Sequence, residues 1–64
     1  MTYGKASKLA KEKSLKSDDN FIVYSDDKEG HIEYHVAEED NFWFAVDVFQ
    51  REEAIWSNGK SEQL

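Results

Sequence analysis

Phe21-Ile22-Val23-Tyr24 is the first run of β-branched and aromatic residues in the chain. Such a run favours a strand. Apolar residues recur at every second position in two later stretches, from His31 to Ala37 and from Phe42 to Phe49. The connections 25–30 and 38–41 are short and polar, as in hairpin turns. The sequence therefore predicts a three-stranded antiparallel β-meander over residues 21–49.

The third predicted strand carries apolar residues on both faces. We expect one face to form the core with the second strand, and we expect Trp43 and Phe49 to point the other way. One interpretation is that a helix covers Trp43, with Trp56 or Leu9 as the contact. The alternative is that Trp43 and Phe49 form an exposed aromatic anchor for a second copy or another protein. The predicted core positions are Ile32, Tyr34, Val36, Phe42, Phe44, Val46 and Val48.

The segment before the first strand has the composition of a helix. Residues 6–16 are rich in Ala, Leu, Lys and Glu and lack Gly and Pro, which predicts a helix from Ala6 to Lys16. Its apolar stripe is thin, with Leu9 as the one large side chain. The turn-forming residues 17–20 should end it.

The segment after the third strand has good helix propensity. We expect a short helix from Gln50 to Trp56, begun by Glu52 and Glu53 and ended near Asn58-Gly59. The predicted fold is thus α+β in one domain, residues 1–64, with a basic N-terminal helix and a short C-terminal helix. Its parts are a basic helical segment 1–17, the meander 21–49, the helix 50–58 and a frayed tail 59–64.

Composition limits the classes of protein that this chain fits. It has 64 residues and no cysteine, so neither a disulfide nor a thiolate metal site can support the fold. No stretch approaches the roughly 20 apolar residues of a membrane span. We expect a cytoplasmic protein with no membrane contact.

The net charge of −6 divides unequally along the chain. Residues 1–16 hold five lysines and one glutamate, a net charge of +4, while residues 17–64 hold three basic and thirteen acidic residues, a net charge of −10. Opposite poles of this kind bear on the choice of partner and on association rate.

The meander predicts that the acidic residues before the first strand and those between the second and third strands meet at one edge. Such an edge either keeps the protein soluble or docks on a basic groove in place of nucleic-acid phosphates. The residues of this predicted acidic face are Asp18, Asp19, Glu38, Glu39 and Asp40.

The lysine-rich helix suggests a second function, nucleic-acid binding. Lys5, Lys8 and Lys11 would contact phosphates, and Tyr3 or Trp43 would stack on a base. The acidic remainder of the chain would repel nucleic acid, so this is the alternative.

Two short patterns resemble metal sites but fit them poorly. Residues 25–32 match a calcium loop at four positions, yet Ser25 and Val36 stand where the first and last carboxylate ligands belong. His31, Glu33 and His35 share a face, but the two histidines are roughly 13 Å apart along a strand. They suggest a polar outer face or a weak pH sensor. We predict no metal and no cofactor.

The chain shows no nucleophile, base and orienting acid in a known arrangement, and no phosphate-binding loop. We therefore expect a non-enzymatic protein-interaction module, monomeric or homodimeric. It would be an inhibitor or modulator of a nucleic-acid-handling enzyme, of the kind that phage and mobile-element genes encode. A homodimer joined through Trp43 and Phe49 is the third hypothesis.

Overall fold

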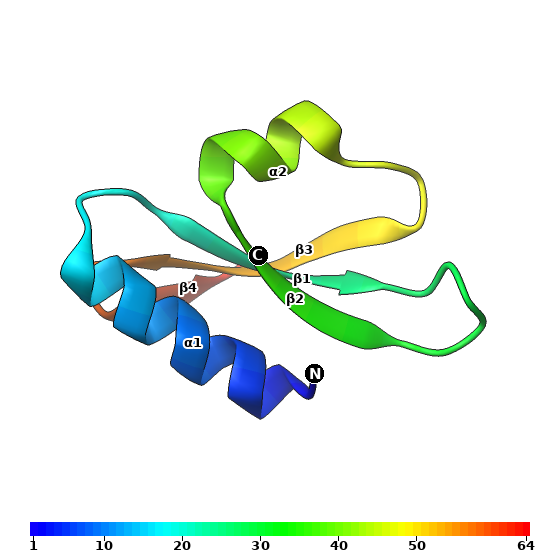
Figure 1. Ribbon diagram of the computed structural model, residues 1–64, viewed down its shortest axis with the longest axis horizontal. Coiled ribbons are helices and arrows are strands. Elements are labelled where there is room, and N and C mark those ends of the chain that lie inside the picture. The colour runs from blue at the N-terminus through cyan, green and yellow to red at the C-terminus, as the bar shows by residue number, and fades with distance from the viewer.

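The computed structural model describes all residues 1–64 and has two helices and one sheet (Figure 1). The fold class is α+β with an antiparallel sheet, as predicted, but the sheet has four strands instead of three, in the order β2-β1-β3-β4. The elements in chain order are α1 (Tyr3–Lys16), β1 (Phe21–Asp26), β2 (Glu33–Glu38), α2 (Glu39–Ala45), β3 (Gln50–Ser57) and β4 (Lys60–Gln63).

The helix α1 confirms the first predicted helix and extends it by one turn. Thr2 caps its N-terminus, with the Thr2 hydroxyl accepting a hydrogen bond from the Lys5 amide at 3.2 Å. Its buried stripe is Ala6, Ala10 and Ser14, and Leu9 is only partly buried. The helix therefore packs on the sheet through small side chains instead of the large apolar contact expected at Leu9.

The helix α1 covers one face of the sheet. Ala6 and Ala10 form the core with Val23 of β1, and all three are fully buried. Tyr3 meets Tyr34 of β2 edge to face, with ring centroids 5.3 Å apart. The partly buried residues around this cluster are Tyr3, Phe21, Tyr34, Val36 and Trp56.

The helix α2 covers the opposite face. Successive strand residues point to opposite faces, so Tyr24 faces away from the side of Val23. The ring of Tyr24 lies 5.0 Å from that of Phe42, the buried residue of α2. Figure 1 accordingly shows the two helices on opposite sides of the sheet, a three-layer arrangement.

The prediction of a third strand from Phe42 to Phe49 is wrong. Residues 39–45 form α2, and only Phe42 of the predicted core positions in this segment is buried. Phe44 is 94% exposed and Val48 is 92% exposed. Two acidic residues in the first turn of α2 favour a helix there, and the second face of the sheet needs a cover that a further strand would not supply.

The predicted helix from Gln50 to Trp56 and the predicted frayed tail are also wrong. Residues 50–57 form β3, which pairs with the free edge of β1, and residues 60–63 form β4. Asn58 and Gly59 have φ angles of 52° and 78°, the positive values of the two-residue turn that suits a tight hairpin. Asn58-Gly59 therefore joins two strands instead of ending a helix.

The structure contains no helix of the length and apolar character needed to cross a membrane.

Candidate functional site: the acidic edge

The acidic edge is the surface formed by the α1–β1 loop and the junction of β2 with α2. Phe21 pairs with Glu38 at the shared end of β1 and β2, which brings the two acidic segments side by side. They surround a shallow hollow of about 200 Å³ that no basic or apolar residue lines. The lining residues are Asp18, Asp19, Asn20, Glu38, Glu39 and Asp40. All five residues of the predicted acidic face thus lie around one hollow.

Asn20 holds the two halves of the acidic edge together. Its carbonyl oxygen accepts a hydrogen bond from the Glu39 amide at 2.9 Å, and its side-chain nitrogen donates to Glu39 Oε1 at 3.4 Å. Its side-chain oxygen accepts a hydrogen bond from the Ser57 hydroxyl of β3 at 2.7 Å. The sequence suggested Asn20 only as a turn former, because its bonds to residues 39 and 57 depend on the tertiary fold.

The carboxylates of the acidic edge have no cationic partner in the structure. The only close contacts between a carboxylate and a basic side-chain nitrogen join Glu33 to His31 and His35, at 3.2 and 3.7 Å. Five carboxylates without counter-ions create a concentrated negative potential that attracts lysine and arginine side chains. No group of three or more His, Asp or Glu side chains is placed to hold a metal ion.

The predicted aromatic anchor does not form as one patch on a strand. Trp43 lies on α2, is 52% exposed and meets the ring of Phe42 edge to face at 5.0 Å. Phe49 follows α2 in the loop before β3, is 45% exposed and lines a separate groove. The strand that was expected to place them on one face is absent. Phe44, which the sequence pattern assigned to the core, is the most exposed aromatic residue.

The three lysines of the alternative hypothesis lie on α1. Lys5, Lys8 and Lys11 are all exposed, and their spacing of three residues runs them along the side of the helix away from Ala6 and Ala10. They are therefore accessible, on an element that lies across the sheet from α2.

The phenol of Tyr24 has a raised pKa that affects stability at alkaline pH. Burial raises the pKa of Tyr24 above its ordinary value of 10.0, and the charges of Asp26 and Asp47 add to the shift. The folded state therefore keeps this proton at a pH where the unfolded state has lost it. The resulting stability is present below the ordinary pKa and decreases as the pH rises through the folded pKa.

We expect Tyr24→Phe to remove that alkaline loss. In urea denaturation at pH 8 to 11, the unfolding free energy of the native chain should decrease relative to that of the variant. If the unfolding free energies of the two proteins changed in parallel with pH, the alkaline loss of stability would not come from Tyr24.

Comparisons of this chain with protein-family models, with curated proteins and with solved structures found no match.

Proposed function

We propose that this chain is a small acidic protein-interaction module whose acidic edge docks on the basic groove of a nucleic-acid-handling enzyme and blocks or modulates it. The observation that carries the proposal is the hollow lined by five carboxylates without counter-ions, held together by Asn20. A basic groove that binds phosphates also attracts a fixed array of carboxylates. Electrostatic steering then accelerates the encounter, and the rate falls as salt increases.

The charge distribution outside the edge supports a protein partner. Residues 17–64 carry a net charge of −10, so most of this domain repels nucleic acid. The same charge attracts a basic protein surface from a distance that depends on ionic strength.

A charge reversal at the edge tests the proposal. Asp18→Lys combined with Asp40→Lys changes two exposed side chains that make no hydrogen bond, so the fold should persist. The matched control is Glu29→Lys with Glu62→Lys, which changes the net charge equally at two exposed positions outside the hollow.

The first measurement is a pull-down from lysate of the source cell with the tagged protein, eluted in steps of salt, with a nuclease-treated sample in parallel. We expect a protein partner that survives nuclease and elutes with salt. Affinity for the isolated partner should then fall on the order of tenfold with the edge variant and little with the control. An equal loss of affinity for the edge variant and the control variant would contradict docking through the acidic edge.

The alternative function, nucleic-acid binding by α1, is favoured by the exposure of Lys5, Lys8 and Lys11 along one side of the helix. It predicts that nuclease removes every partner and that Lys8→Glu with Lys11→Glu abolishes the interaction. If the lysine variant lost the interaction and the acidic-edge variant kept it, nucleic-acid binding by α1 would replace docking through the acidic edge as the proposed function.

A further inference from the structure

A groove lies on the α1 side of the sheet, beyond the part that α1 covers. Ser25 shares a face with Val23 and pairs with Tyr34 on one side and Arg51 on the other. The helix begins at Tyr3, beside Tyr34, so the sheet surface at Ser25 stays open. The resulting groove has a volume of about 460 Å³, enough for one or two side chains of a ligand.

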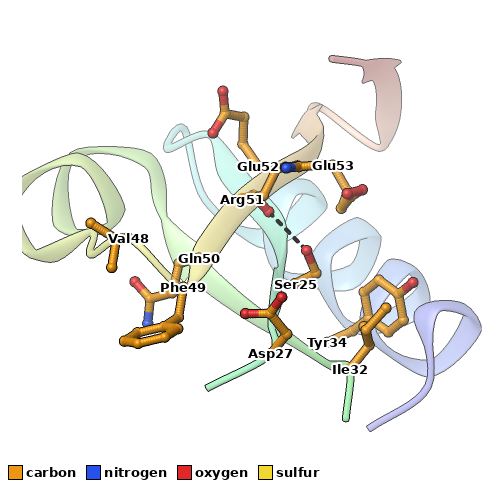
Figure 2. Close-up of a pocket in the computed structure, with 10 residues that line it drawn as sticks. All are labelled: Ser25, Asp27, Ile32, Tyr34, Val48, Phe49, Gln50, Arg51, Glu52 and Glu53. Carbon is orange, nitrogen blue, oxygen red and sulfur yellow. Dashed lines mark hydrogen bonds between the residues drawn. The ribbon is translucent and has the colours of Figure 1, made fainter. Parts of the chain in front are cut away.

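Apolar side chains form the two walls of the groove. Figure 2 shows Val48 and Phe49 on one side and Ile32 and Tyr34 on the other, with Ser25 between them. Ile32 is 63% exposed and Val48 is 92% exposed, so both side chains are accessible to a ligand.

Hydrogen bonds hold the Phe49 wall in place. The Phe49 amide donates to Asp47 Oδ1 at 2.9 Å, and the Phe49 carbonyl accepts from the Asp27 amide at 3.2 Å. The Gln50 side chain donates to Asp26 Oδ2 at 3.2 Å. Hydrogen bonds from the Lys28 backbone amide and, next in size, from Gln50 lower the pKa of Asp26. The loop before β3 is thus tied to the β1–β2 hairpin, and the groove is preformed.

The polar rim of the groove is acidic. Three carboxylates, those of Asp27, Glu52 and Glu53, line it together with one guanidinium, that of Arg51. None of these four groups takes part in an ion pair. An apolar side chain flanked by lysine or arginine would complement both the walls and the rim. A second copy of the chain is a poorer occupant, because it would bring its own net charge of −6.

We propose that this groove binds a peptide segment of another protein that presents an apolar side chain between basic residues. It lies at the Asp26 end of β1, whereas the acidic edge lies at the Phe21 end, so the two surfaces are separate. The proposal does not depend on the function assigned to the acidic edge.

The probe is the capped peptide Lys-Lys-Leu-Leu-Lys-Lys, added to the ¹⁵N-labelled full chain and followed by amide chemical shifts. We expect saturable shifts at Ser25, Tyr34, Phe49 and Arg51, with a Kd on the order of 1 mM or below. The capped peptide Lys-Lys-Ser-Ser-Lys-Lys should bind roughly tenfold more weakly because it lacks the apolar side chains. Glu-Glu-Leu-Leu-Glu-Glu should not bind.

Two groove variants and one control complete the test. Ile32 lies outside the strands and Phe49 lies before β3, so serine at either position should leave the sheet intact. Ile32→Ser and Phe49→Ser should each weaken binding of the leucine peptide at least roughly fivefold. Phe44→Ser, which removes a more exposed aromatic side chain outside the groove, should leave the affinity for the leucine peptide unchanged. If Ile32→Ser or Phe49→Ser failed to fold, the other variant and the peptide comparison would still decide.

Three outcomes would overturn the proposal. The first is equal binding of the serine and leucine peptides, which would indicate charge attraction alone. The second is the absence of shifts in the groove, or shifts confined to the acidic edge. The third is a set of groove shifts that depend on protein concentration without any peptide, which would make a second copy the occupant.

Discussion

Replacing Phe42 with alanine should destabilise the protein by about 3–5 kcal/mol, the usual cost of truncating a buried phenylalanine. Phe42 is 3% exposed and is the one buried residue of α2. Its ring centroid lies 5.0 Å from that of Tyr24 and 5.0 Å from that of Trp43. A chain of this size has a total stability of only about 3–10 kcal/mol, so the variant should lose much of its folded population.

The measurement is urea denaturation followed by circular dichroism, with Phe44→Ala as the control. Phe44 belongs to the same helix and is 94% exposed, so its truncation should cost no more than about 0.5 kcal/mol. Similar losses of unfolding free energy for Phe42→Ala and Phe44→Ala would show that Phe42 does not hold α2 to the sheet.

Replacing Ser14 with alanine should cost about 1–3 kcal/mol, because it leaves a backbone donor without its partner. Ser14 is fully buried in α1. Its hydroxyl donates to the Lys11 carbonyl at 2.9 Å and accepts from the Gly59 amide at 2.9 Å. The second bond ties the helix to the turn between β3 and β4, 45 residues later in the chain.

Ser7→Ala is the matched control, because it makes the same change on the same helix. The Ser7 hydroxyl is buried without a hydrogen-bond partner. Its removal should be neutral or stabilising, since alanine is the better helix former and no bond is lost. The two variants should therefore shift the urea midpoint in opposite directions or by clearly different amounts. Equal midpoints would argue against the link between Ser14 and Gly59.

The acidic edge illustrates how one correct pairing can position a site. Because β1 and β2 form an antiparallel hairpin, the residues before β1 and those after β2 must meet at one end of the sheet. That consequence follows from the order of the first two strands alone. The wrong predictions of a strand at residues 42–49 and a helix at residues 50–56 therefore did not affect the predicted grouping of these five carboxylates.

The groove at Ser25 could not be predicted in the same way. It requires β3 to occupy the free edge of β1, which places Arg51 beside Ser25, and it requires the loop before β3 to position Phe49. Both depend on a strand that the helix propensity of residues 50–56 concealed. The Asn58-Gly59 pair was the available signal, because these residues favour a two-residue hairpin turn.

Composition and periodicity were enough to predict α1, β1, the division of charge and a second strand, although β2 begins at Glu33 and leaves the predicted core residue Ile32 63% exposed. The tertiary structure decided the rest. Residues 42–49 alternate like a strand and residues 50–56 have the composition of a helix, yet each adopts the other kind of structure or a loop. Residues 50–57 pair with the free edge of β1, and Phe42 is buried on the uncovered face of the sheet. These two tertiary interactions outweigh the weak local preferences of the two segments.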